Sequence, residues 1–231
     1  MDQHICAILL AGGSGSRMKS DVTKQRIRID GETVLCRAVS AFSRCNEIND
    51  IIVVVKEGEL DFATEEIGDM PKVRKIVIGG KSRVESAENG FNAIDFLTNF
   101  VAIHDVARCL ITPDMITKVV IDAKKYGAAS ASSSVVDTVK IVDKNGFVVN
   151  TIDRDALRLA TTPQIFRYDL YEKALRDESI DKTDVTDDNM LMERIGVKVY
   201  MTDIGKRNIK ITHKQDVSLA EYLLRCEDES L

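Results

Sequence analysis

Apolar runs typical of buried strands alternate with segments of helical periodicity along this chain. The first run, Ile5–Leu10, is apolar throughout, as expected for a strand that is covered on both faces. Further strands are predicted at Ile51–Val55, Lys75–Ile78, Phe100–His104 and Ala128–Ser134, with helices around 34–42, 84–94 and 112–126. This β-α-β-α order predicts an α/β fold, in which a mostly parallel sheet lies between two layers of helices.

The C-terminal third continues the pattern less regularly. Helices are predicted around Tyr168–Leu175 and Asp188–Ile195, a strand at Val197–Met201, and a closing helix at Val217–Leu224. In open α/β sheets, ligands bind at the carboxyl ends of the strands. Polar residues that follow the strands are therefore the first candidates for a functional site.

One segment breaks the alternation. Thr138–Val142 and Val148–Ile152 flank Asn145-Gly146, the favoured turn pair of a two-stranded hairpin. A hairpin does not fit easily into a parallel sheet, so we expect residues 137–160 to project from the domain as a β arm. Because the edges of such an arm are exposed, it is expected to meet a partner chain.

Composition limits the class of protein. The 231 residues suffice for one large core, and we expect a single domain over 1–231. The balance of 32 basic and 37 acidic residues disfavours nucleic-acid binding, and no apolar run approaches the roughly 20 residues that span a bilayer. Met1–His4 lacks the basic start of a signal peptide, and five scattered cysteines form no C-x-x-C pair. These features predict a cytoplasmic protein without membrane or nucleic-acid partners.

A glycine-rich turn, Leu10–Met18, follows the first strand. Its backbone N–H groups could cradle an anion, or the turn could simply connect a strand to a helix. Met18 stands where a dinucleotide fingerprint needs glycine, and Lys75 stands where a P-loop ending at Gly80-Lys81-Ser82 needs one. What remains is a glycine turn followed by Arg17 and Lys24, a combination suited to a triphosphate.

At these residues the chain resembles the sugar-phosphate nucleotidyltransferases, through the pattern A-G-G-x-G-x-R-M and Lys24-Gln25. Later segments narrow the resemblance to the 2-C-methyl-D-erythritol 4-phosphate cytidylyltransferases. They are Gly79-Gly80-x-x-Arg83-x-x-Ser86-x-x-Asn89-Gly90, His104-Asp105-x-Ala107-Arg108, Asp137-Thr138, Asp153-Arg154, Thr162-Pro163-Gln164, Thr186-Asp187-Asp188 and Asn208–Thr212. Ribitol-5-phosphate cytidylyltransferases share most of these positions and are the alternative, together with enzymes for other polyol phosphates. The Ser86-x-x-Asn89-Gly90 stretch is more similar to the methylerythritol family.

The resemblance implies a Rossmann-like α/β/α fold and a homodimer in which the β arm completes the neighbouring site. It implies a Mg²⁺-dependent reaction of CTP with 2-C-methyl-D-erythritol 4-phosphate, giving the CDP-linked product and pyrophosphate. The resemblance assigns catalysis to Arg17, Lys24 and Lys210; CTP binding to Ala11, Gly12, Gly13, Gly15, Gly80, Ser86 and Asp105; acceptor binding to Arg108, Thr138, Arg154, Thr162 and Thr186; and the metal to Asp105.

Each assignment competes with a structural role. Lys210 could be a strand-edge lysine and Ser86 a solvent-facing residue of its helix, while Asp105 could cap the next turn. The alternatives for the other residues are an ion pair of Arg108 with Asp105, a surface ion pair of Arg154 with a flanking aspartate, and a helix N-cap at Thr186-Asp187-Asp188, which we favour for Thr186.

The sequence also departs from the family pattern. Thr23 and Cys109 replace prolines, and Arg26 replaces an aromatic residue. These changes affect loop stiffness and leave the proposed catalytic charges in place. A non-catalytic nucleotide-binding regulator would be expected to have lost those charges, and no Ser-His-Asp or Cys-His set supports a hydrolase.

Overall fold

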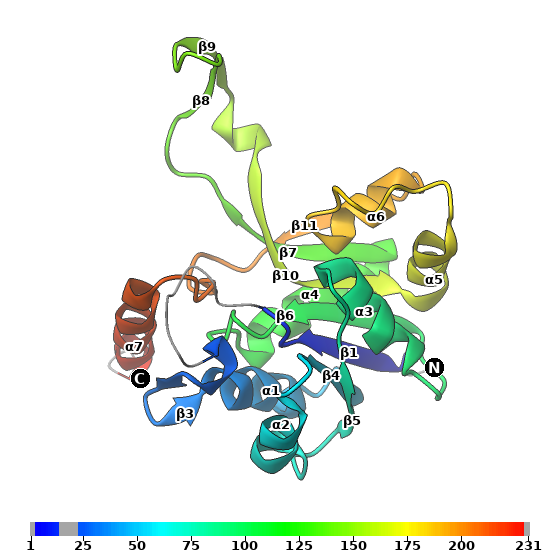
Figure 1. The fold of residues 1–231 in the computed structure, drawn as a ribbon. Coiled ribbons are helices and arrows are strands. Elements are labelled where there is room, and N and C mark those ends of the chain that lie inside the picture. Colours follow the sequence, from blue (N-terminus) through cyan, green and yellow to red (C-terminus); the bar gives the residue numbers. More distant parts are fainter. Residues whose placement is uncertain (1–2, 14–22, 229–231) are drawn as a thin grey trace.

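The computed structural model describes residues 3–13 and 23–228 of the chain. Within them, seven strands form one sheet in the order β11-β7-β10-β6-β1-β4-β5. β1 (Ile5–Leu10) is paired in parallel with both β4 (Asp50–Val55) and β6 (Phe100–Asp105), and β5 (Val73–Ile78) continues the parallel set beside β4. The predicted α/β fold with a mostly parallel sheet is confirmed (Figure 1).

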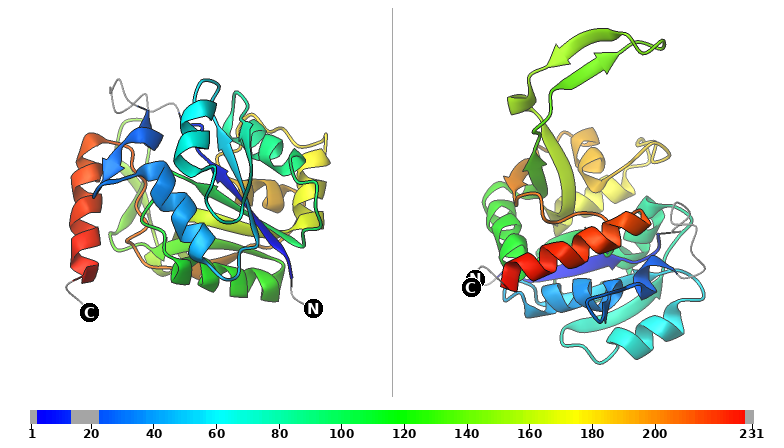
Figure 2. Two further views of the ribbon diagram at one scale, coloured as in Figure 1. Left: turned by 90° about the horizontal axis from the view of Figure 1, so that it is seen from below. Right: turned by 90° about the vertical axis from the view of Figure 1, so that its left-hand side faces the viewer.

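Helices cover both faces of this sheet, because the central strands bury side chains in both directions. Ile5, Ala7 and Leu9 face one core together with α1 (Val34–Arg44), α2 (Leu60–Ile67), α4 (Pro113–Tyr126) and α7 (Lys214–Asp228). Ile8 and Leu10 face the opposite core with α3 (Arg83–Asn92), α5 (Tyr168–Arg176) and α6 (Asp188–Arg194). The two helical layers on either side of the sheet are visible in Figure 2.

Local signals determine several helix ends as the sequence predicts. The hydroxyl of Thr112 accepts a hydrogen bond from the backbone N–H of Met115, and Pro113 occupies the first turn of α4. Gly127 ends the same helix with φ of 85°, a left-handed conformation that favours glycine. These caps explain why the boundaries of α4 could be predicted closely.

One central strand was missed by the sequence patterns. β10 (Arg158–Arg167) lies between β6 and β7 (Ala128–Ser134) and is antiparallel to both. Its sequence contains Pro163 and a polar Thr-Thr pair, which normally argue against a central strand. The pairing with β7 shifts register between Ala160 and Gln164, so the sheet accommodates the proline at an irregularity.

Other boundaries also differ from the predictions. β11 spans Tyr200–Asp203, so the strand predicted at Val197–Met201 begins three residues later and pairs with β7. α2 and the short hairpin of β2 (Arg28–Ile29) and β3 (Glu32–Thr33) were not predicted. None of the described helices has the length and apolar content that crossing a membrane requires.

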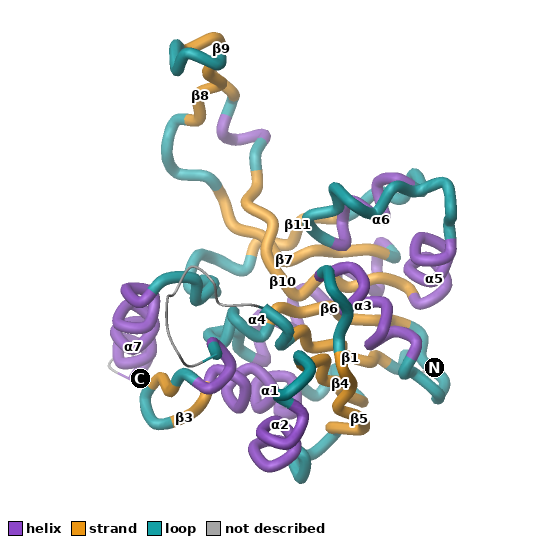
Figure 3. Tube along the Cα trace, viewed as in Figure 1, coloured by secondary structure: helices purple, strands orange, loops and turns teal. Residues whose placement is uncertain are grey.

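The predicted β hairpin is present and stands away from the sheet. β8 (Val139–Val142) and β9 (Val148–Ile152) form a separate two-stranded sheet, followed by the 3-10 turn η3 (Arg154–Ala156). Figures 1 and 3 show this arm extending beyond the body of the molecule. Phe147 at its tip is 72% exposed, and Val148 and Val149 beside it are also exposed.

Candidate active site

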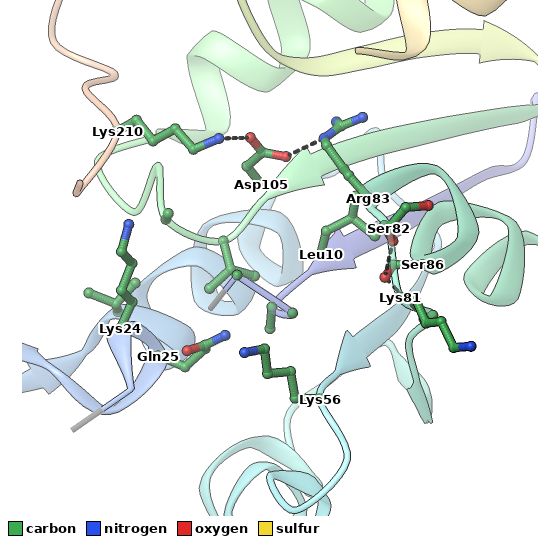
Figure 4. Close-up of a pocket in the computed structure, with 17 residues that line it drawn as sticks. Leu10, Lys24, Gln25, Lys56, Lys81, Ser82, Arg83, Ser86, Asp105 and Lys210 are labelled. Carbon is green, nitrogen blue, oxygen red and sulfur yellow. Dashed lines mark hydrogen bonds and ion pairs between the residues drawn. The ribbon is translucent and has the colours of Figure 1, made fainter. Parts of the chain in front are cut away.

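A cavity of about 430 Å³ opens at the carboxyl ends of the parallel strands. Residues from four of the predicted motifs line it, together with Lys56 after β4 (Figure 4). The predicted site residues in its wall are Ala11, Gly12, Gly13, Lys24, Gly80, Ser86, Asp105 and Lys210. The fold therefore gathers into one space side chains that lie up to almost 200 residues apart in the sequence.

Ser86 on α3 faces this cavity and not the solvent. Its hydroxyl accepts a hydrogen bond from the backbone N–H of Gly80 at 3.1 Å and donates one to the carbonyl of Ser82 at 2.8 Å. A Cβ atom on Gly79 would lie 2.7 Å from the Ser86 oxygen, so only glycine permits this approach. The solvent-facing alternative for Ser86 is wrong, because its residue surface is only 7% exposed.

Lys24 reaches the cavity from the 3-10 helix η2 (Lys24–Arg26). Its ammonium donates a hydrogen bond to the carbonyl of Ile211 at 3.1 Å. The backbone N–H of Ile211 in turn donates to the carbonyl of Ala107, just beyond β6. These two hydrogen bonds hold the segment that carries Lys210 beside the carboxyl end of β6. This segment is not a strand, so the alternative that Lys210 is a strand-edge lysine is wrong.

Asp105, the last residue of β6, lies at the centre of the site. Its carboxylate accepts one bond from Lys210 Nζ at 2.7 Å and one from Arg83 Nε at 3.1 Å. Burial alone would raise the pKa of this carboxyl, but the charges of Arg83 and Lys210 outweigh it and hold the pKa well below its ordinary value. Among the described residues, the carboxylate makes no capping bond to the following turn, and Arg108 is not its ion-pair partner.

Arg83 is the main residue that the sequence reasoning overlooked. It was part of a quoted motif but received no role. Its Nη1 also pairs with the buried Asp188 at 2.6 Å, so it connects α3, β6 and α6. Lys56 was overlooked as well, although its position directly after β4 could have indicated it.

A second cavity of about 270 Å³ adjoins the first. Arg83, Asp105 and Lys210 line both cavities and form the wall that they share. Arg108, Thr162 and Thr186, all predicted for the acceptor, line the second cavity only. The structure therefore places these three predicted acceptor residues beside the predicted nucleotide residues, with Asp105 in the wall between the two cavities.

The guanidinium of Arg108 has N–H donors that the described residues do not use. Its Nη1 donates to the carbonyl of Asn208 at 3.1 Å, whereas its buried Nε has no hydrogen-bond partner in the described part of the chain. Burial lowers the pKa of Arg108, although a guanidinium remains charged. A buried donor without a partner is costly unless a ligand completes it, so the second cavity is suited to an anionic or polyhydroxylated molecule.

Thr162 supports the site from behind. Its hydroxyl accepts from the backbone N–H of Asp105 at 3.1 Å and is 3.0 Å from His104 Nδ1. Burial lowers the pKa of His104 to about 3, so the imidazole is neutral near pH 7. Both residues help to fix the end of β6.

Thr186 is not the cap of α6. The carboxylate of Asp187 accepts the hydrogen bond from the Met190 N–H, whereas the Thr186 hydroxyl contacts the sulfur of Met190 at 3.2 Å. The favoured structural role therefore belongs to the neighbouring residue. Thr186 itself lines the second cavity.

Thr138 and Arg154 lie on the arm and line neither of these cavities. Arg154 Nη1 donates to the carbonyl of Val136 at 2.6 Å, and no ion pair of Arg154 with a flanking aspartate is present in the described part. Gly15 and Arg17 lie outside the described residues.

The donor set of the site suits a divalent cation that substrate phosphates help to hold. The described residues contain no group of three or more histidine, cysteine or acidic side chains that could hold a metal by themselves. Mg²⁺ commonly uses one or two carboxylates, with substrate phosphates and waters as its other ligands. Asp105, an ionised carboxylate in the wall of the larger cavity, fits a Mg²⁺ site of this kind, in which substrate phosphates supply the other ligands.

Comparisons with known proteins agree on one family. The family model described as 2-C-methyl-D-erythritol 4-phosphate cytidylyltransferase matches residues 5–226. Proteins of that name from Clostridium acetobutylicum and Clostridium perfringens strain SM101 are 40% and 36% identical, covering 95% and 96% of this chain and 97% and 99% of their own.

Solved structures give the same result. The 4-diphosphocytidyl-2C-methyl-D-erythritol synthase of Anaerococcus prevotii superposes with a TM-score of 0.87 at 29% identity, covering 97% of this chain and 100% of that one. The 2-C-methyl-D-erythritol 4-phosphate cytidylyltransferase of Thermus thermophilus gives a TM-score of 0.75 at 26% identity, with the same coverage.

Proposed function

The chain belongs to the 2-C-methyl-D-erythritol 4-phosphate cytidylyltransferase family, and from this premise we propose that it transfers the cytidylyl group of CTP to 2-C-methyl-D-erythritol 4-phosphate. The reaction releases pyrophosphate and serves the non-mevalonate route to isoprenoids. The observation that carries the proposal is the pair of adjoining cavities that share Arg83, Asp105 and Lys210. A two-substrate transfer needs two such compartments that meet at the reacting atoms.

The chemistry explains why cations dominate the site. A phosphate oxygen of the acceptor attacks the α-phosphorus of CTP, a new P–O bond forms, and the bond to the β-phosphate breaks. Pyrophosphate leaves with the electron pair. Because the attacking phosphate is already ionised near neutral pH, the protein mainly has to position two polyanions and offset their charge.

We assign Lys24, Lys210 and Arg17 to the CTP phosphates. Lys24 and Lys210 reach the larger cavity from different segments, which supports a clamp on the reacting phosphates. The nucleotide would be bound by the backbone and small side chains of Ala11, Gly12, Gly13, Gly15, Gly80 and Ser86, together with Asp105.

For the acceptor, we assign Arg108 and Thr186 as direct contacts from the smaller cavity. Thr162 lines the same cavity but shares its hydroxyl with Asp105 and His104, so its proposed contribution includes holding the end of β6. Thr138 and Arg154 would bind the acceptor phosphate, for which an arginine is well suited.

We propose that Asp105 holds Mg²⁺ together with the phosphates of CTP. The bound metal would offset charge that develops on the α-phosphate and the leaving pyrophosphate. Arg83 and Lys210 keep the carboxylate ionised, as a metal ligand must be.

The position of Thr138 and Arg154 leads us to propose a homodimer. Both residues lie on the projecting arm, away from the two cavities of their own chain, and the arm exposes Phe147, Val148 and Val149. An exposed apolar hairpin is covered favourably by a second copy, whose site would then receive Arg154 of the partner subunit. We propose that the arm belongs to a single nucleotidyltransferase domain spanning 1–231.

A cytoplasmic location is also proposed. It is supported by the cysteines of the described part of the chain, none of which forms a disulfide, and of which Cys6, Cys45 and Cys109 are buried. Burial raises the pKa of the Cys109 thiol to about 11, as expected for a structural thiol that is not reactive.

The test is an acceptor screen with CTP and Mg²⁺ that measures pyrophosphate. Release is expected with 2-C-methyl-D-erythritol 4-phosphate and not in the acceptor-free control. A folded, Mg²⁺-loaded protein that releases no pyrophosphate with this acceptor contradicts the proposal. Faster turnover of ribitol 5-phosphate would indicate the alternative acceptor.

A further inference from the structure

Arg83 occupies the wall between the two cavities but directs its hydrogen bonds to protein carboxylates. It is the first residue of α3, directly after the N-cap Ser82. Its Nε donates to Asp105 at 3.1 Å, and its Nη1 donates to Asp188 at 2.6 Å (Figure 4 shows the bond to Asp105). Arg83 therefore links the carboxylate at the centre of the site to one that lies outside it.

Asp188 is held firmly by its surroundings. Its side chain is fully buried, and its second oxygen accepts a hydrogen bond from the Tyr171 hydroxyl at 2.7 Å. Its backbone N–H donates to the side-chain oxygen of Gln164 on β10 at 2.9 Å. Since Asp188 begins α6 and Tyr171 belongs to α5, three elements fix this carboxylate.

This arrangement is costly to maintain for stability alone. Buried ion pairs lose hydration, and replacing them with apolar residues is often neutral or stabilising. Neither Asp188 nor Tyr171 lines one of the two cavities, so substrate contact does not explain them. What they achieve is a fixed anchor for the guanidinium of Arg83.

Asp105 needs such an anchor because its other ion-pair partner, Lys210, constrains the carboxylate less than an arginine does. The Lys210 side chain is 41% exposed, a lysine stem has four rotatable carbons, and the phosphates of bound substrates would compete with Asp105 for its ammonium. The planar guanidinium of Arg83 can hold two carboxylates in fixed directions, which a lysine cannot.

We propose that Arg83 is a positioning residue. Asp188 and Tyr171 hold its guanidinium in one orientation, and the guanidinium in turn holds the Asp105 carboxylate in place between the two substrates. The inference rests on the proposed cytidylyl transfer. It extends that proposal to residues of α5 and α6 that touch neither substrate cavity.

Arg83→Lys and Asp188→Asn test the proposal. The first keeps the charge but loses the two-carboxylate geometry, and the second removes the anchor with little change of volume. Because misplacement of a reacting group by about 1 Å costs roughly 100-fold in rate, we expect each to lower kcat about 10- to 100-fold. The Kd of CTP, measured by calorimetry with Mg²⁺ and no acceptor, should change by less than about threefold, since the binding charges remain.

The double variant shows whether Arg83 and Asp188 affect kcat through the same chain of contacts or independently of each other. Residues that act as one unit give non-additive losses, so Arg83→Lys with Asp188→Asn should be no slower than the slower single variant. Three results overturn the proposal: kcat of Arg83→Lys within twofold of wild type, a rise in Kd that matches the fall in kcat, or a double loss equal to the product of the single losses.

Tyr171→Phe carries the test if the other variants do not fold. It keeps the ring in its core and removes only the hydroxyl that holds Asp188. We expect kcat to fall about three- to tenfold at unchanged CTP affinity, in line with the net contribution of one ordinary hydrogen bond. If Tyr171→Phe folds and keeps the kcat of the wild type, the proposal that Tyr171 and Asp188 anchor Arg83 is rejected.

Arg176→Lys is the matched control, because Arg176 pairs with Glu88 at the surface and lines neither cavity. It should keep wild-type kcat. Wild-type protein is assayed in parallel with 2-C-methyl-D-erythritol 4-phosphate. An inactive wild type would refute the proposed function, whereas an active wild type with an unaffected Arg83→Lys would refute only this inference.

Discussion

The roles of the lysines at the larger cavity follow from the atoms that surround their ammonium groups. Lys24 is 9% exposed and points into a cavity that Lys210 enters from another segment. The Lys24 ammonium is held by the carbonyl of Ile211 and the Lys210 ammonium by Asp105, so two cations from distant segments are positioned at one cavity, where they can offset the charge of a polyanion. The arrangement therefore favours a polyphosphate ligand.

Lys24→Ala tests this interpretation. Removing one cation from the phosphate clamp should lower kcat by roughly 100- to 1,000-fold and weaken CTP binding as well. Pyrophosphate release and calorimetric titration with CTP measure the two effects. Lys173→Ala, an exposed lysine on α5, should behave as wild type. Normal turnover by Lys24→Ala would contradict its assigned role.

Asp105 gives a prediction about stability and pH. Its pKa in the folded protein lies below the ordinary carboxyl value, so the ionised form stabilises the fold. This contribution is complete above the unfolded pKa of about 3.9 and is lost as the pH falls through the lower folded pKa.

Asp105→Asn removes that contribution, so its Tm should differ most from wild type near neutral pH, and the difference should narrow on acidification below about pH 4. Thermal denaturation of both proteins between neutral and acidic pH measures it. A Tm difference that is constant over this range would show that the ion pairs of Asp105 do not stabilise the fold.

At the scale of elements, α3 brings the site together by lying close to the sheet. A Cβ atom on Gly90 would come within 2.4 Å of Ile8 on β1 and 2.8 Å of Val54 on β4. Glycine at this point lets the helix approach both strands. The close approach also places Arg83 and Ser86, which belong to the same helix, at the cavity wall.

Gly90→Ala should therefore push α3 away from the sheet. Overpacking of this kind typically lowers the free energy of unfolding by about 1–3 kcal/mol, which urea denaturation measures. Asn92→Ala, on the exposed side of α3, removes only a surface hydrogen bond from Arg176; it is the control and should cost less than about 0.5 kcal/mol. Equal stability of Gly90→Ala and wild type would show that the helix can shift freely.

At the scale of the whole molecule, the arm separates two assigned acceptor residues from the cavities they would serve. Thr138 and Arg154 line neither cavity, whereas Arg108 and Thr186 line the smaller one. The proposed dimer resolves this separation, because the arm of one copy can complete the site of the other.

Mixing two inactive variants tests the exchange of arms. In a hybrid of Arg154→Ala and Lys24→Ala, one site combines the intact body of the first chain with the intact arm of the second. Random exchange makes half of the dimers hybrid, so about one quarter of wild-type activity should return. Each variant mixed with itself is the control. No recovery, despite hybrids detected by mass spectrometry, would place Arg154 in the site of its own chain.

Local sequence patterns and the family resemblance predicted the layers of the fold, the arm and eleven of the residues that line the two cavities. Apolar periodicity, the Thr112 cap and the Asn145-Gly146 turn act over a few neighbouring residues, so they can be identified without the fold. Gly12 and Asp105 could be expected at one edge because parallel strands end there together.

The places where distant segments meet depend on the three-dimensional fold and could not be predicted from local patterns. β10 enters the sheet despite Pro163, because pairing with strands on both sides outweighs its unfavourable local sequence. The ion pairs of Asp105 with Arg83 and Lys210 join residues 22 and 105 positions away in the chain. Such contacts depend on strand order and on burial, which a local pattern does not encode, and they are what turn separate motifs into one site.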